Sequence, residues 1–541
     1  MTSSAHDESA GPEHPERPAG RAASAVADPG GGADLQADTV VVPADEDPTA
    51  AAGSELLGGA PGRRALLGVS WWTPARFLAL AVIVVFVLGM VQKSPCYSGG
   101  WFFGSSDAQY THACYSDIPH LFSGRGFAQG LLPYKDMIPP GPDGSRDPHM
   151  QYLEYPVLTG LFMQVATWLT PRSGVIAPDR AQWFWMVNAG MLLVCAVVAV
   201  IAVMRTHRRR PWDALLFALA PALALNATVN WDLLAVALTA VGMAYWAGKR
   251  PVAAGVLIGL ATAAKLYPVL LLGPLLVLCL RAGRMRDFGR ALGGAVAAWA
   301  VVNVPVMFWN WDGWKTFYSF SQSRTEDYGS FWLIIQHQRN QVSLGTGVLN
   351  LCIAILLISC CAGIGWIALS APRRPRFAQL AFLVVAAFVL TNKVYSPQYV
   401  LWLIPLAALA RPRWRDFLIW QACEVAYFLG IWMYLAFIAD TKQHGLPVFG
   451  YHVVILVHVF GTLYLCGMVL RDILLPERDP VRWDGSDDPS GGVLDGAPDR
   501  FVLGQARWEQ EEASYAPYAP VGAVGAADGE DWPPLPATDR L

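Results

Sequence analysis

Apolar residues along the middle of the chain fall into long runs rather than the short alternations of soluble helices and strands. A helix that crosses a bilayer needs about 20 such residues, because the apolar core is ~30 Å thick. The pattern predicts an all-α polytopic integral membrane protein, with apolar runs at residues 75–92, 155–171, 183–204, 212–228, 231–248, 252–266, 268–280, 291–309, 346–369, 377–391, 399–410, 417–439 and 452–470.

Clusters of arginine and lysine separate many of these runs and mark the cytoplasmic ends of the spans. If the spans alternate, every cluster from Arg205 onward lies inside, as does the basic segment before residue 75. Three runs precede Arg205, however, and three crossings would place that cluster outside. Either 155–171 does not cross, or the cluster is misassigned. We favour a short, partly embedded helix at 155–171, which leaves about 12 crossings.

This topology places both termini in the cytoplasm of a plasma-membrane protein. The loops at 93–151 and 310–345 then lie outside the cell. The first is too long for a simple connector, since loops above ~12–15 residues are usually functional or disordered. Its many aromatic residues argue against disorder.

Charge is distributed unevenly along the chain. The net charge of −3 hides two acidic ends, residues 1–62 and 473–541, each at −9, and a basic body between them. The ends have few apolar residues and predict disordered cytoplasmic tails at 1–74 and 473–541, around a membrane domain at 75–472. Only 15% of the residues are charged and 54% are apolar, which excludes a soluble protein and a nucleic-acid binder.

Two of the nine cysteines differ from the rest in their setting. Cys96 and Cys114 share the first outer loop, 18 residues apart, whereas the other seven lie in apolar runs and suit packing. If the loop faces an oxidising compartment, this pair is a plausible disulfide.

Ionisable residues gather at the outer ends of the apolar runs: Asp117, Glu154, Asp232, Lys265 and Lys393. Such a group at membrane depth costs ~2.5–3.5 kcal/mol and needs a partner or a function. Two interpretations stay open. The groups pair internally, for example Asp232 with Lys265 or Lys393, or they form an outward-facing site for an anionic, membrane-borne substrate.

The order of these residues and their neighbours resembles glycosyltransferase family 87, the polyprenyl-phosphate-mannose-dependent mannosyltransferases of actinobacteria. A more distant similarity is to the catalytic subunit of GPI mannosyltransferase I. The resemblance covers about residues 75–472. It rests on Tyr115-Ser116-Asp117-Ile118-Pro119, Leu132-Pro133-Tyr134, Tyr152-Leu153-Glu154-Tyr155-Pro156, Asn230-Trp231-Asp232, Lys265-Leu266-Tyr267-Pro268 and Lys393-Val394-Tyr395-Ser396-Pro397-Gln398-Tyr399.

The resemblance implies a GT-C fold and an inverting transfer of a hexose, expected to be mannose, from a polyprenyl phosphate to a glycolipid or glycan acceptor in the cell envelope. It implies that Asp117 is the general base, with Asp107 as a rival. Lys393 and Lys265 would stabilise the leaving phosphate, and Glu154 or Asp232 would orient the sugar. The further substrate-binding candidates are Tyr267, Tyr395, Gln398 and Tyr399.

No cofactor is expected, and the donor is itself the substrate. Relatives with an Asp-x-Asp pair could hold a metal ion, but here Pro119 occupies the second position, so we predict metal-independent chemistry. Two other functions remain as alternatives. Glu424, deep in a predicted span, would suit a transporter of lipid-linked sugars, and the acidic tails would suit a non-catalytic membrane scaffold.

Overall fold

The computed structural model describes residues 40–56, 73–101, 108–141, 144–171, 177–439, 444–483 and 485–504. Over these ranges the chain is helical, without a strand. The α-helices are α1 (Pro43–Glu46), α2 (Pro48–Leu56), α3 (Pro74–Gln92), α4 (Ala108–Thr111), α5 (Asp117–Gly124), α6 (Val157–Leu169), α7 (Ala177–Thr206), α8 (Leu215–Ala218), α9 (Pro221–Asn226), α10 (Asp232–Ala247), α11 (Pro251–Ala264), α12 (Leu272–Arg281), α13 (Met285–Trp309), α14 (Trp311–Ser323), α15 (Phe331–Gln338), α16 (Thr346–Ser370), α17 (Phe377–Thr391), α18 (Val400–Ala410), α19 (Trp414–Ala439) and α20 (Val448–Leu474).

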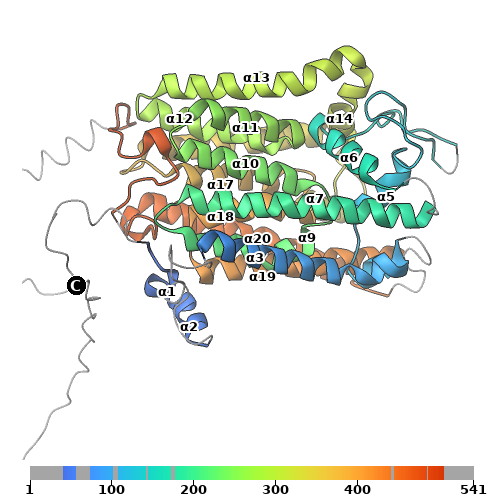
Figure 1. The fold of residues 1–541 in the computed structure, drawn as a ribbon, viewed down its shortest axis with the longest axis horizontal. Coiled ribbons are helices and arrows are strands. Elements are labelled where there is room, and N and C mark those ends of the chain that lie inside the picture. The colour runs from blue at the N-terminus through green and yellow to red at the C-terminus, as the bar shows by residue number, and fades with distance from the viewer. Residues whose placement is uncertain are drawn as a thin grey trace, which may run out of the picture. The chain divides into compact units, whose positions relative to one another are not determined.

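The all-α membrane architecture predicted from the sequence is confirmed. Among the described residues, six helices are long and apolar enough to cross a bilayer: α3, α7, α13, α16, α19 and α20. Shorter apolar helices, including α10, α11, α17 and α18, lie among them (Figure 1). The number of crossings, about 12, stays a prediction.

The predicted span at 212–228 is wrong as a continuous helix. It consists of a 3₁₀ turn at Pro211–Ala214, then α8, then α9. The backbone of Ala220 is extended before Pro221, which ends one piece and begins the next. Nearly all of this segment is buried in the protein, where a broken helix is tolerated because neighbouring groups satisfy its backbone.

The helix pair α17–α18 forms the centre of the structure. All eleven residues of α18 are buried, as is most of α17, so neither helix presents a polar stripe. Between them lies the segment 392–399, which carries several of the predicted site residues. The two helices therefore hold this segment on rigid, enclosed supports.

The connections between helices lie at two opposite ends of this bundle. We call the end with Arg205–Arg210, Arg281 and Arg411 the basic end, and the end with segments 108–156, 310–345 and 392–399 the loop end. At the basic end Asp499 pairs with both Arg281 and Arg374, and at the loop end Lys393 donates to the carbonyl of Gln322.

Helix α6 begins and ends at the loop end, which agrees with a short embedded helix at 155–171. Thr159 near its start donates to the carbonyl of Ala264, the last residue of α11. The next helix, α7, starts again beside the loop 93–151, since Arg180 and Gln182 donate to carbonyls of that loop. Figure 1 shows α6 beside α5 at this end.

Glycines allow α11 and α13 to pack at backbone contact. A side-chain carbon at Gly255 or Gly259 would collide with the carbonyls of Ala291 or Ala295 on α13. Small residues at four-residue spacing serve this purpose in membrane helices, because burial from lipid gives little hydrophobic driving force.

Part of each predicted tail is folded, which differs from the expected disorder. In the N-terminal segment, Glu46 pairs with Arg210 at 2.9 Å, and the carboxylate of Asp47 accepts from the backbone N–H of Trp414 at the start of α19. The acids expected to be solvated thus neutralise an arginine and a helix N-terminus. Residues 1–39 and 57–72 lie outside the described ranges.

The C-terminal segment 475–503 packs on the basic end in the same way. Asp499 pairs with Arg281 and Arg374, and Asp488 accepts from the backbone N–H of Phe377 at the start of α17. Composition did not predict this order, because the acids match arginines that lie far away in the sequence. Residues 505–541, the rest of the predicted tail, lie outside the described ranges.

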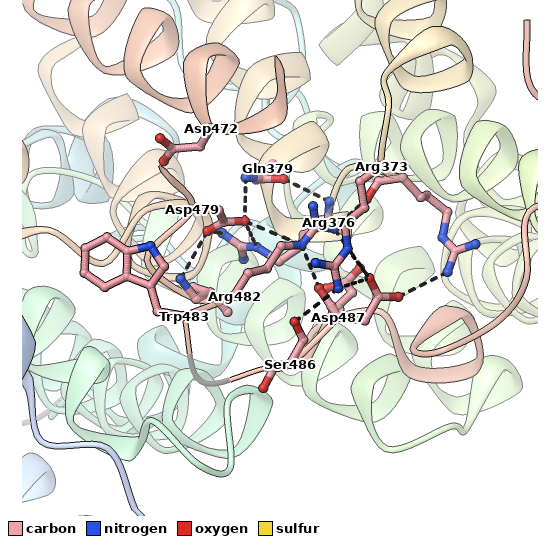
Figure 2. Close-up of polar contacts among 12 residues, drawn as sticks. Arg373, Arg376, Gln379, Asp472, Asp479, Arg482, Trp483, Ser486 and Asp487 are labelled. Carbon is pink, nitrogen blue, oxygen red and sulfur yellow. Dashed lines mark hydrogen bonds and ion pairs between the residues drawn. The ribbon is translucent and has the colours of Figure 1, made fainter. Parts of the chain in front are cut away.

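Asp479 forms the best-buried of these contacts. Figure 2 shows its carboxylate between Arg376 and Arg482, with Gln379 beside it. Arg376 lies 2.7 Å from Asp479 and also donates to the carbonyls of Leu409 and Ala410, the last turn of α18. Burial alone would raise the pKa of Asp479, but the charge and hydrogen bonds of Arg376 lower it, so the carboxylate is ionised.

We expect Asp479→Asn to destabilise the folded protein, because it leaves the guanidinium of Arg376 buried without a counter-charge. Breaking such a pair costs about 3–5 kcal/mol. The melting temperature in detergent should fall clearly, whereas Arg290→Gln, which removes an exposed arginine at the same end, should change it little. Equal melting temperatures for the two variants would show that the C-terminal segment does not stabilise the bundle.

Candidate active site

A cavity of about 830 Å³ opens at the loop end. Its walls come from the loop before α5, the end of α14 and the segment after it, α16, segment 392–399 and α19. Of the residues predicted from the sequence, it is lined by Asp117, Glu154, Lys265, Tyr267, Lys393, Gln398 and Tyr399. The structure therefore gathers most of the predicted set around one space.

Asp117 is the partly exposed carboxylate at the start of α5. Ser116 caps this helix by accepting from the backbone N–H of Ile118, which fixes the backbone at Asp117. The Tyr115 hydroxyl donates to Oδ1 of Asp117 at 2.8 Å, and the Asn230 amide donates to Oδ2 at 2.7 Å. Burial, and then the charge of Asp117, raise the pKa of Tyr115, so its hydroxyl keeps the proton that it donates.

The disulfide Cys96–Cys114 lies just before this carboxylate. The structure thus joins the two cysteines that the loop position indicated. The covalent link ties Cys96, which follows α3, to the chain three residues before Asp117 and holds that part of the loop in place. Asp107, the rival base, lies outside the described residues.

Asp232 and Lys265 form an internal pair, one of the two interpretations that the sequence left open. Asp232 is fully buried, with its Oδ1 3.3 Å from Lys265 Nζ and 2.7 Å from the Trp402 indole nitrogen. Lys265 also reaches Asn230 at 3.4 Å and so lies between Asp232 and the Asn230–Asp117 pair. Asp232 therefore stands behind the wall of the cavity, whereas Lys265 is part of it.

Glu154 is held by a partner that sequence reasoning missed. Arg125, at the end of α5, binds both carboxylate oxygens of Glu154 at 2.6–2.9 Å. Burial alone would lower the pKa of Arg125, but the hydrogen bonds and charge of Glu154 raise it. Nothing in the sequence singled out Arg125. It lies 29 residues before Glu154, and no short motif contains both residues.

Lys393 differs from Lys265 because no carboxylate pairs with it among the described residues. Its Nζ donates to the Gln322 carbonyl at 3.0 Å and the Asn350 side-chain carbonyl at 2.6 Å, which are both neutral. Burial and the nearby charge of Arg324 lower the pKa of Lys393. The other three cations that line the cavity each have an acidic partner: Arg125 has Glu154, Lys265 has Asp232, and Arg324 has Asp327 at 3.0 Å.

Aromatic rings form the remaining walls. Trp402 stacks on Tyr399 and Tyr267, with ring centroids 3.9 and 4.6 Å apart. Across the cavity Tyr115 stacks on Trp432 at 4.8 Å. Tyr267 and Tyr399 are therefore wall residues, and the Tyr267 hydroxyl donates to Thr239 in the interior at 3.2 Å.

Tyr395 is turned away from the cavity. Its hydroxyl lies 3.2 Å from Thr462 in the interior, and its ring is buried. The same interior cluster contains Glu424, which accepts from Trp420 and Thr462 at 3.2 and 3.1 Å. Glu424 was the residue that favoured a transporter, and these internal partners account for its burial.

Comparison with known families gives one family likeness for this site. Residues 152–391, 240 of the 541 in the chain, match the model of glycosyltransferase family 87. The matched part includes Glu154, Asp232 and Lys265, while Asp117 and Lys393 lie outside it. This part of the chain is therefore similar to a glycosyltransferase family.

A distant structural neighbour is the crystal structure of the Archaeoglobus fulgidus oligosaccharyltransferase in complex with zinc and sulfate. It is 13% identical, with a TM-score of 0.31, and the match covers 82% of this chain. The match spans 56% of the neighbour's own length, a little over half. No curated protein matches the chain.

We expect Lys265→Met to destabilise the protein, because it leaves the Asp232 carboxylate buried without a cation, at a cost of about 3–5 kcal/mol. Adding Asp232→Asn should recover much of the lost melting temperature, since the uncompensated charge disappears. Lys315→Met, whose partner Asp312 is exposed, is the matched control and should change little. An unchanged melting temperature in Lys265→Met would show that Asp232 does not need this lysine.

Proposed function

We propose that this protein is a membrane glycosyltransferase that transfers a hexose, expected to be mannose, from a polyprenyl phosphate to an acceptor hydroxyl outside the cell, with inversion at the sugar C1. One observation carries the proposal. A single cavity combines a partly exposed carboxylate, Asp117, with Lys393, a cation paired only with neutral oxygens. The first group suits a base and the second suits an anionic leaving group.

In the proposed reaction Asp117 accepts the proton of the acceptor hydroxyl as that oxygen bonds to C1. The bond between C1 and the donor phosphate oxygen breaks, and its electron pair stays on the polyprenyl phosphate. A positioned carboxylate base contributes typically 10²–10⁴-fold. Tyr115 and Asn230 hold the carboxylate in place and are positioning residues.

Lys393 and Arg324 would stabilise the charge on the leaving phosphate. Fixed cations in a site with few waters stabilise developing charge at no reorganisation cost during the reaction. The neutral carbonyls of Gln322 and Asn350 orient Lys393 without cancelling its charge. Gln398 lines the same cavity and would add a neutral donor.

The surroundings of the cavity also suit a lipid-linked donor. Asn350 and Ile353 of its lining belong to α16, the helix with the largest share of its surface exposed among the six long ones. A polyprenyl chain would leave the cavity beside this helix. The stacked rings of Tyr115 and Trp432 would supply the flat apolar faces on which sugars pack.

The positive-inside rule would place the basic end in the cytoplasm and the cavity outside. The folded parts of both tails lie at the basic end, in keeping with cytoplasmic termini. The acceptor would be a glycolipid or cell-envelope glycan, because both substrates must reach the outer face. The expected independence from metal ions stays a prediction, and the transfer assay below would test it by adding a chelator.

We expect Asp117→Asn to lower the transfer rate by about 10²–10⁴-fold without weakening donor binding. The substitution removes the carboxylate that accepts the proton but keeps the shape of the side chain. Purified protein with polyprenyl-phosphate-[14C]mannose and a membrane lipid extract would measure the rate. Asp312→Asn, an exposed outer carboxylate outside the cavity, is the control. Turnover at the wild-type rate in Asp117→Asn would remove this residue as the base.

We expect donor binding to weaken as the pH rises, because burial and Arg324 lower the pKa of Lys393 and its cation is lost earlier than that of an ordinary lysine. Lys393→Arg should keep its charge and hold affinity to higher pH, since arginine stays protonated. Lys393→Met should bind donor weakly at every pH. Identical pH profiles for the wild type and Lys393→Arg would contradict a role of the Lys393 charge.

A further inference from the structure

A second cavity, of about 640 Å³, lies between α7 and α10 near the basic end, far from the residues of the candidate active site. Its walls are apolar, with Val197, Val198 and Ile201 from α7 and Val241 and Ala244 from α10. These positions recur at helical spacing and form one stripe on each helix. Val198 is 41% exposed, so the groove opens outward from the bundle.

Three arginines stand at one end of this groove: Arg205, Arg208 and Arg250. All three are exposed. The guanidinium of Arg250 lies 5.9 Å from the ring of Tyr245, which also lines the groove. Within the described part of the chain, none of the three forms an ion pair with a carboxylate.

Other arginines at the basic end are neutralised. Arg210, Arg376 and Arg411 are buried and form ion pairs with acids. These acids include Glu46 and Asp479 of the folded tail segments. The folded tail segments therefore neutralise buried arginines such as Arg210 and Arg376. They form no ion pair with the three arginines at the end of the groove among the described residues.

The length of the groove fits one leaflet of a bilayer. Val197 and Arg205 are eight residues apart on α7, which corresponds to about 12 Å at a rise of ~1.5 Å per residue. One leaflet contributes about half of an apolar core of ~30 Å. The apolar walls would thus lie at the depth of acyl chains, with the arginines at the depth of headgroups.

We propose that this groove binds an anionic phospholipid of the inner leaflet, with an acyl chain along α7 and α10 and the headgroup phosphate at Arg205, Arg208 and Arg250. Basic pockets between membrane helices recognise anionic headgroups in this way. A free phosphate would use the arginines but not the apolar walls that continue from them. The proposal rests on the cytoplasmic position of the basic end and is independent of glycosyl transfer.

The full-length protein in detergent would be titrated with phosphatidylglycerol or with phosphatidylcholine carrying the same acyl chains. Bound lipid would be counted by native mass spectrometry, and the melting temperature would be recorded. We expect tighter binding of phosphatidylglycerol and a rise in melting temperature. The triple variant Arg205→Gln, Arg208→Gln and Arg250→Gln should bind phosphatidylglycerol about 100-fold more weakly. Each of the three cations is expected to contribute a similar factor, about fivefold, to the affinity for the anionic headgroup.

Two further variants keep the test decisive. Arg284→Gln, Arg286→Gln and Arg478→Gln remove the same charge from exposed positions outside the groove and should bind like the wild type. Val198→Trp, which keeps all the arginines but fills the groove, should lose binding. If the arginine triple variant does not fold, this single variant alone tests the site.

Three results would overturn the proposal. Phosphatidylcholine could bind as well as phosphatidylglycerol, which would mean that the arginines recognise no charge. The control triple variant could lose as much affinity as the groove variant, which would mean a diffuse surface effect. Soluble glycerol 3-phosphate could raise the melting temperature as much as the lipid, with Val198→Trp unaffected, which would mean a phosphate site without an acyl chain.

Discussion

A charge buried in an apolar helical bundle must be neutralised or put to use, and this constraint orders the structure. At the basic end Arg376 is satisfied by Asp479 and by two carbonyls of α18. At the loop end Asp232 is satisfied by Lys265 and Trp402. Lys393 alone among these groups meets only neutral oxygens. Its uncompensated charge faces the cavity, where an anionic substrate can supply the missing partner.

The central helix pair α17–α18 links the two ends. Its basic end is fixed by the C-terminal segment, since Asp488 caps α17 and Arg376 joins the start of α17 to the last turn of α18. Its loop end presents residues 392–399 to the cavity. The tail segment therefore supports the active-site loop through two rigid helices, although none of the tail residues that the structure describes lines the cavity. Acidic residues that composition assigns to a solvated spacer are here part of the fold.

Local patterns predicted much of this arrangement and missed what depends on pairing across the chain. Runs of apolar residues located the helices, and the polar residues at their ends on the loop side located the cavity. Arg125 was missed because its partner, Glu154, lies 29 residues away and no short motif joins them. Tyr395 was expected in the site from its neighbour Lys393, but adjacent residues in a turn point in different directions, and its hydroxyl meets Thr462 in the interior. The break before Pro221 was hidden by its apolar surroundings.

We propose that a lipid-linked sugar binds with its phosphate at Lys393 and its sugar facing Asp117. An electron cryo-microscopy structure of the Asp117→Asn variant with bound polyprenyl-phosphate-mannose would test it most directly, because this variant should hold the donor without consuming it. We expect phosphate density against Lys393 and Arg324, with the sugar between them and residue 117. Phosphate density at the arginines of the basic end, or a sugar outside the cavity, would contradict it.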